Sequence, residues 1–200
     1  MAYIIGAIIG YLFGCVNMAN IIAKSRGIDI KAVGSNNAGA SNVFVSIGKI
    51  YGVAVGAFDI LKAFLAAELT LFLFSSVPEA AFVAGVMAVM GHDFPFWMHF
   101  RGGKGLASFM GVVLFYDWKV FLCLAVIIAA AALITDFISI GSLSVSAIMP
   151  VYTVIIKEDI FTIVVFAVLG VMVWIKHIEN IKRIANRTEI GFLRKNRVKK

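Results

Sequence analysis

Residues 3–23 read YIIGAIIGYLFGCVNMANIIA, a run of 21 residues without a charged side chain. A helix needs about 20 mainly apolar residues to cross the hydrocarbon core of a bilayer. Gly6, Gly10 and Gly14 fall four residues apart, so in a helix they line one face and allow a second helix to approach closely. The run therefore predicts a membrane-spanning helix packed on a partner. It lacks the basic start and the small-residue cleavage site of a signal peptide, and we expect it to be retained.

The rest of the chain has the same apolar character. Of its 200 residues, 62% are hydrophobic and 14% are charged, which leaves too few polar side chains to cover a water-soluble globule. We predict an all-α, polytopic integral membrane protein that forms a single membrane-embedded domain over residues 1–200. Its seven expected transmembrane helices cover residues 3–23, 51–74, 80–97, 106–115, 120–135, 140–156 and 160–175. The fourth is short, so it is either a tilted helix in a locally thin region or a re-entrant helix.

Loop charges set the expected orientation. With the N-terminus outside, 15 of the 18 Lys and Arg residues fall in cytoplasmic loops or in the tail, and the outside loops hold only Lys119 and Lys157. This asymmetry follows the positive-inside rule. We therefore expect an outside N-terminus, cytoplasmic active-site loops and a basic cytoplasmic tail over residues 177–200. Asp59 and Lys62, three residues apart in the second segment, are expected to neutralise each other.

The first cytoplasmic loop contains Gly34–Asn42, GSNNAGASN, which has no acidic residue. Small side chains leave backbone N–H groups accessible, and such loops cradle phosphate where a helix begins. Taken alone, the pattern also fits a flexible connector, because Gly, Asn and Ser dominate turns.

The second cytoplasmic loop, residues 91–105, reads GHDFPFWMHFRGGKG. Gly102 and Gly103 allow the backbone to come close to an anion, and Lys104 adds a positive charge at the start of the next helix. The loop is not a Walker A motif, because the lysine is followed by glycine instead of Ser or Thr. Its two histidines lack the ligand spacing of a zinc site, so we expect no metal.

A third group of polar residues lies at the start of the tail and in the fifth connection. At helical spacing His177 and Asn180 share one face of a half-apolar helix, which could fold back along the membrane and turn polar groups inward. Ser139 and Ser142 add hydroxyls in the fifth connection, on the same side. For residues 194–200 we favour attraction to anionic lipid head groups. All these groups offer anion donors on the cytoplasmic face without a cluster of acids.

The motifs resemble, in the same order, those of the bacterial PlsY family, the acyl-phosphate:glycerol-3-phosphate acyltransferases. The matching residues are Gly34, Ser35, Asn37, Gly39 and Asn42; Gly91, His92, Phe94, Pro95 and Gly102 to Gly105; and His177, Glu179, Asn180, Ile181 and Glu189. The resemblance covers almost the whole chain. It implies seven transmembrane helices in a bacterial cell membrane, no cofactor, and acyl transfer from acyl phosphate to glycerol 3-phosphate. The products would be lysophosphatidic acid and inorganic phosphate, in the first step of phospholipid synthesis.

With the resemblance, we assign roles to individual residues. The expected catalytic residues are Lys104, His177, Asn180 and Ser35. The expected substrate-phosphate-binding residues are Asn37, Ser41, Asn42, Gly102, Gly103, Ser139, Ser142, His92 and Arg187. We expect a monomer that binds the two small-molecule substrates and the lipid bilayer, and no nucleic acid.

The chain also departs from the family pattern. Val45 stands where the family usually has arginine, and Arg187 where it prefers glycine. We consider two interpretations of Arg187: its guanidinium replaces the missing one, or it faces lipid head groups. Two other functions remain open from the sequence, a small organic-anion transporter and a catalytically weakened relative of the enzyme.

Overall fold

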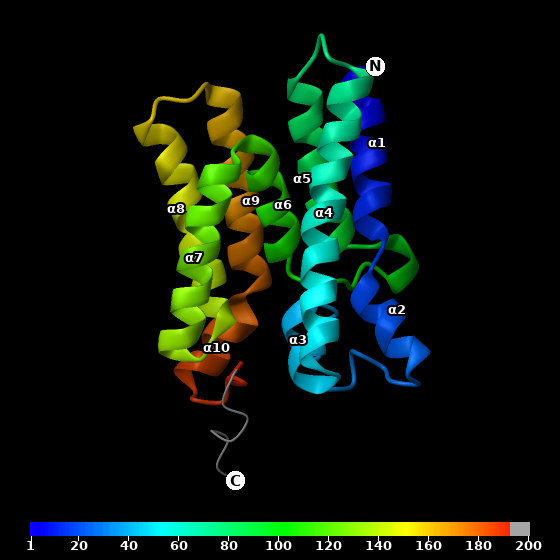
Figure 1. Ribbon diagram of the computed structural model, residues 1–200, viewed down its shortest axis with the longest axis vertical. Helices are drawn as coiled ribbons and strands as arrows, with labels where there is room; N and C mark the ends of the chain where they lie inside the picture. The colour runs from blue at the N-terminus through cyan, green and yellow to red at the C-terminus, as the bar shows by residue number, and fades with distance from the viewer. Residues whose placement is uncertain (193–200) are drawn as a thin grey trace. The chain divides into compact units, whose positions relative to one another are not determined.

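The computed structural model describes residues 1–192, and within this range all regular secondary structure is helical (Figure 1). The chain groups into two compact units, residues 1–118 and the part from Lys119 onward, and we describe each by itself. The first unit contains α1 (Ala2–Cys15), α2 (Met18–Ser25), α3 (Ala40–Ser46), α4 (Lys49–Leu73), α5 (Glu79–Asp93), the 3-10 turn η1 (Phe96–Met98) and α6 (Leu106–Tyr116). The second contains α7 (Trp118–Thr135), apart from its first residue, and α8 (Ile138–Ile155), α9 (Ile160–Lys176) and α10 (Ile178–Ala185).

Each predicted apolar segment coincides with helix in the structure. Five helices within residues 1–192 are long and apolar enough to cross a membrane, Ala2–Ser25 being counted as one of them. A sixth span results if α9 and α10, which meet at a bend of 48°, are taken together. The short segment is α6, with 11 residues. An all-helical membrane architecture is thus confirmed, whereas the count of seven spans and the single domain stay predictions.

The glycine face predicted in the first run packs on α5. A Cβ placed on Gly10 would lie 2.0 Å from the carbonyl oxygen of Ala84. Only glycine allows the two backbones to come this close, as in other helix pairs of membrane proteins. The expected close approach of a second helix is confirmed.

The first apolar run is broken between α1 and α2. Val16 is extended, with φ −70° and ψ 105°, and the next residue, Asn17, caps α2 by accepting a hydrogen bond from the N–H of Asn20 at 2.8 Å. The Nδ2 of Asn17 also donates to the carbonyl oxygen of Ala38 at 3.1 Å. A short polar side chain at an N-cap thus ends one helix, begins the next and holds the first loop against the break.

In the second unit, α8 packs on α9. Asp159 caps α9, since its carboxylate accepts from the N–H of Thr162 at 3.1 Å and from the Thr162 hydroxyl at 2.6 Å. These hydrogen bonds hold the pKa of the Asp159 carboxyl below its usual value. After α10 the chain returns to the connection between α7 and α8, where the N–H of Phe192 donates to the carbonyl oxygen of Asp136 at 2.8 Å. Residues 193–200 of the predicted basic tail lie outside the described range.

Candidate functional site

The first glycine-rich loop is organised around the side chain of Asn42, in α3. Asn42 is buried, and its Oδ1 accepts from the N–H of Ser35 at 2.9 Å. Its Nδ2 lies 3.0 Å from three backbone carbonyl oxygens, those of Ile30, Val33 and Asn37. The amide of Asn42 therefore holds Ser35 and Asn37 in place, and phosphate binding by Asn42 stays a prediction. Ser35, Asn37 and Ser41 are half-buried.

The second glycine-rich loop is held against the end of α5. The N–H of Gly102 donates to the carbonyl oxygen of Asp93 at 2.9 Å, and that of Gly103 donates to the carbonyl oxygen of His92 at 3.0 Å. Lys104 follows, half-buried, immediately before Gly105 and the first turn of α6. The two loops are also joined, because the Lys31 ammonium donates to the carbonyl oxygen of Arg101. The structure thus brings the first two sequence motifs together within one unit.

A buried polar cluster lies behind the second loop. The Lys62 ammonium is 2.7 Å from Oδ1 of Asp59, which confirms the predicted ion pair. The same nitrogen donates to the carbonyl oxygen of Val16 at 2.9 Å and lies 3.0 Å from Nδ1 of His92. Asp59, Lys62 and His92 are each 2–3% exposed. His92, expected to bind phosphate, is therefore engaged behind the loop, and its contact with Lys62, 30 positions away, was not anticipated from the sequence.

Trp97 adds a further anchor to this region. Its indole N–H donates to the carbonyl oxygen of Cys15 at 2.8 Å, and the hydroxyl of Tyr11 donates to the carbonyl oxygen of Phe94 at 2.9 Å. Both contacts fix the start of the second loop to the end of α1. Trp97 was not singled out from the sequence, where it looks like an ordinary residue of an apolar stretch.

The second unit holds His177 and Asn180 around the bend between α9 and α10. Nδ1 of His177 is 2.8 Å from the carbonyl oxygen of Val173. Nδ2 of Asn180 donates to Oε1 of Glu189 at 2.6 Å, while Nε of Arg183 donates to the other oxygen of this carboxylate at 2.7 Å. Glu189, which only the family resemblance had marked, therefore orients Asn180.

Ser139 and Ser142 lie at the start of α8, both buried. The hydroxyl of Ser142 donates to the carbonyl oxygen of Ile138 at 3.0 Å. Within residues 1–192, the buried hydroxyl of Ser139 has no hydrogen-bond partner. Because an unsatisfied buried hydroxyl is costly, this atom is suited to a ligand.

Arg187 follows the C-cap of α10 and is exposed. Its φ is +58°, in the left-handed region. Glycine is the residue that adopts this conformation without strain, and it is common just after a helix ends. The glycine that the resemblance implies at this position would adopt this backbone without strain.

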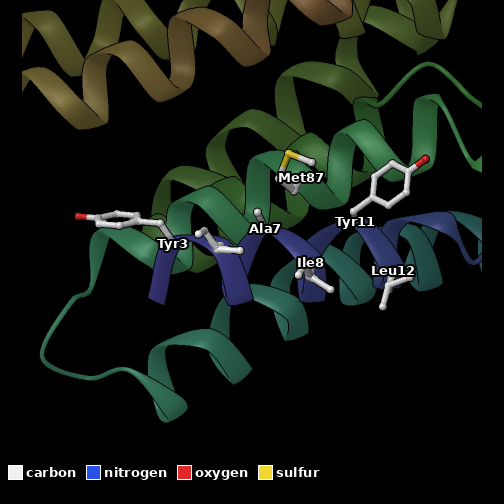
Figure 2. Close-up of a pocket in the computed structure, with 7 residues that line it drawn as sticks. Tyr3, Ala7, Ile8, Tyr11, Leu12 and Met87 are labelled. Atoms are coloured by element: carbon white, nitrogen blue, oxygen red, sulfur yellow. The ribbon is translucent and has the colours of Figure 1, made fainter. Parts of the chain in front are cut away.

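The groove shown in Figure 2 is mainly apolar, unlike the two polar loops. It has a volume of about 440 Å³ and runs along α1, with Tyr3 and Tyr11 near its two ends and Ala7 and Met87 between them. None of the predicted site residues lines it. Among the described residues, no three His, Cys, Asp or Glu side chains are grouped so that they could hold a metal ion.

Comparisons with known proteins agree with this arrangement. A family model described as glycerol-3-phosphate acyltransferase matches residues 4–187. Glycerol-3-phosphate acyltransferase 1 of Oceanobacillus iheyensis is 35% identical over 198 residues, which cover 94% of each chain. The glycerol-3-phosphate acyltransferase of Bacillus velezensis is 39% identical over 183 residues, which cover 91% of this chain and 93% of the relative.

The chain is also similar to solved structures of PlsY (YgiH), an integral membrane glycerol 3-phosphate acyltransferase. The glycerol 3-phosphate form of that protein has a TM-score of 0.90 at 29% identity, covering 96% of both chains. Its lysophosphatidic acid form has a TM-score of 0.86.

Proposed function

The chain belongs to the glycerol-3-phosphate acyltransferase family, and we infer that it transfers an acyl group to glycerol 3-phosphate from an acyl phosphate donor. It is an integral membrane protein with helices long enough to span the bilayer. The acceptor follows from the relatives' names and from the glycerol 3-phosphate form of the similar structure. The donor is our proposal and rests on the chemistry of the loops.

An acyl phosphate is an activated mixed anhydride, so the reaction requires no nucleophile from the protein. A hydroxyl oxygen of glycerol 3-phosphate attacks the acyl carbon, and the bond from that carbon to the bridging phosphate oxygen breaks. Inorganic phosphate leaves with the bonding electrons, and the hydroxyl proton passes to a substrate phosphate oxygen. Catalysis then consists of orienting two anions and stabilising developing negative charge.

The observation that carries the proposal is the fixed glycine loop that ends at Lys104. The N–H groups of Gly102 and Gly103 are bonded to the end of α5, so the loop is preorganised and Lys104 is its cation. The contact of Lys31 with Arg101 brings the first loop, with Ser35 and Asn37, to the same region of the first unit. We propose that Lys104, Ser35 and Asn37 bind phosphate oxygens.

In the second unit, we propose that His177 and Asn180 hold glycerol 3-phosphate. A carbonyl oxygen can only accept, so the contact with Val173 places a proton on Nδ1 of His177. In the neutral ring Nε2 is then the accepting nitrogen, suited to a substrate hydroxyl. Asn180 is oriented for the same task by Glu189. Ser139 is proposed to donate to a phosphate oxygen, and Ser142 to do so after its hydroxyl turns away from the carbonyl oxygen of Ile138.

Purified protein in detergent, supplied with long-chain acyl phosphate and labelled glycerol 3-phosphate, tests the donor. We expect lysophosphatidate and inorganic phosphate in equal amounts. Parallel reactions contain the corresponding acyl-coenzyme A. Product from the coenzyme A ester, with none from acyl phosphate, would contradict the proposed donor. If neither donor gives product and proteoliposomes accumulate glycerol 3-phosphate, the protein is a transporter.

We also propose that the N-terminus faces outside, on the basis of the loop charges. The native cysteines, Cys15 and Cys123, are replaced by serine, and Ala2→Cys and Val198→Cys are introduced separately. A membrane-impermeant maleimide applied to intact cells is expected to label position 2 and to spare position 198. The opposite pattern would reverse the orientation.

A further inference from the structure

We propose that Lys62 fixes His92 as the tautomer with its proton on Nε2, and that this ring positions the Gly102–Gly103–Lys104 loop. The effect on activity rests on the proposed function, in which this loop binds substrate phosphate. His92 is then a positioning residue behind the loop and does not touch the substrate.

The tautomer of His92 follows from the contacts of the Lys62 ammonium. It forms an ion pair with Oδ1 of Asp59 at 2.7 Å, donates to the carbonyl oxygen of Val16 at 2.9 Å and lies 3.0 Å from Nδ1 of His92. The Asp59 carboxylate forms a buried ion pair with this ammonium. An ammonium has three donors and no acceptor, so Nδ1 of His92 accepts.

The distances favour this arrangement over two others. If Nδ1 of His92 were protonated, two donors would face each other at 3.0 Å across this contact. A proton on Nδ1 directed to Asp59 instead would use the longer separation of 3.4 Å, and would cost Lys62 one of its acceptors. Nδ1 is therefore unprotonated, and the proton of the neutral imidazole lies on Nε2.

The Nε2 side of the His92 ring faces the loop. A Cβ on Gly103 would lie 2.0 Å from Nε2 of His92, so the imidazole occupies the space next to this backbone. The N–H of Gly103 donates to the carbonyl oxygen of the same histidine at 3.0 Å. His92 therefore meets the loop twice, through its carbonyl oxygen and through its ring. The orientation of the ring determines where Gly103 and the next residue, Lys104, lie.

The cluster also explains why two charges are retained in an apolar protein. Asp59 and Lys62 belong to α4, His92 ends α5, and Val16 marks the break between α1 and α2. One ammonium therefore connects three parts of the first unit at the base of the loop. A buried ion pair is weak evidence for stability, because replacing both charges together is often neutral. Positioning of the loop gives the pair a function.

Nitrogen-15 NMR of the histidine side chains tests the tautomer of His92. The signals can be assigned because the chain has only three histidines. His177 is the internal reference, since its contact with Val173 requires the opposite tautomer. His99→Asn and His177→Gln variants assign the signals. We expect a protonated Nε2 and an unprotonated Nδ1 for His92, and the reverse for His177. A protonated Nδ1 in His92 would overturn the proposal.

The double variant Asp59→Asn, Lys62→Met tests whether the His92 ring positions the loop. Both charges are removed together so that neither one is left buried without its partner. We expect His92 to gain a population with its proton on Nδ1. The KM for acyl phosphate should rise about 2- to 12-fold, the value of one hydrogen bond, with a smaller change in kcat.

A shift in the tautomer without a change in this KM would show that the ring does not position the loop. If the double variant does not fold, the wild-type spectrum still decides the tautomer. Failure of the proposed donor appears separately, as wild-type protein that makes no lysophosphatidate from acyl phosphate.

Discussion

Replacing Gly103 with alanine adds one methyl group at the tightest contact of the second loop. The new Cβ would lie 2.0 Å from Nε2 of His92, and 2.8 and 2.9 Å from two carbons of the same ring. Ordinary contacts begin at 3.4 Å, so the ring or the loop must move by 1.4 Å, the difference between 3.4 and 2.0 Å. Lys62 holds the ring at 3.0 Å, and we therefore expect the loop to move.

The expected effect on catalysis is large. A misplacement of about 1 Å in a substrate-positioning group can cost roughly 100-fold in rate. We expect kcat/KM for glycerol 3-phosphate to fall about 100-fold in Gly103→Ala, measured as lysophosphatidate formed by purified protein at varied acceptor concentration. Gly56→Ala is the matched control, because its new Cβ would lie 3.6 Å from the Cβ of Ala40. Its activity should stay within about 2-fold of wild type.

A double-mutant cycle then locates the cause. In a His92→Ala background the ring is absent, so Gly103→Ala should add little to the loss already caused by the first substitution. Wild-type activity in Gly103→Ala would refute the reasoning. Equal losses from Gly103→Ala with and without the histidine would place the damage elsewhere in the loop.

Three further predictions concern the other site residues. Lys104→Ala should lower kcat/KM at least 10- to 150-fold, which corresponds to about 1.5 to 3 kcal/mol for a charge-assisted contact. Its circular dichroism spectrum should be unchanged, and wild-type rates would show that Lys104 does not belong to the site. Glu189→Gln should lower kcat/KM about 5-fold, because a neutral amide holds Asn180 less firmly than a carboxylate, whereas unaltered kinetics would show that this contact is dispensable. Arg187→Gly should be about 1 kcal/mol more stable than Arg187→Ala in thermal unfolding, since only glycine relieves the left-handed φ; equal stability would mean that the strain is absent.

The features that could be predicted from the sequence depend on local periodicity. The glycines at 6, 10 and 14 share a helix face whatever their partner is, and the structure places α5 against that face. Asp59 and Lys62 are one helical turn apart, so their ion pair needed no knowledge of the tertiary fold. The positions of the helices followed from the length of each apolar run.

The features that could not be predicted depend on contacts between distant segments. Asn42 looks like one more donor in a polar loop, yet its Nδ2 lies within hydrogen-bond distance of three backbone carbonyl oxygens there. His92 stands beside two glycines and a lysine in the sequence, but its partner Lys62 is 30 positions earlier. The break at Asn17 was missed because the apolar pattern continues through it, and only the cap marks the interruption.

Arg187 shows how a backbone requirement can resemble a functional exchange. The absence of arginine at Val45 and the presence of arginine at 187 suggest from the sequence that one guanidinium replaces the other. The φ of +58° accounts for the family's glycine at 187 without reference to any ligand. An arginine there costs about 1 kcal/mol of backbone strain, and its side chain is exposed. The preference for glycine at 187 thus has a backbone reason of its own. Replacement of the guanidinium missing at Val45 by Arg187 stays a prediction, which a loss of activity common to Arg187→Gly and Arg187→Ala would support.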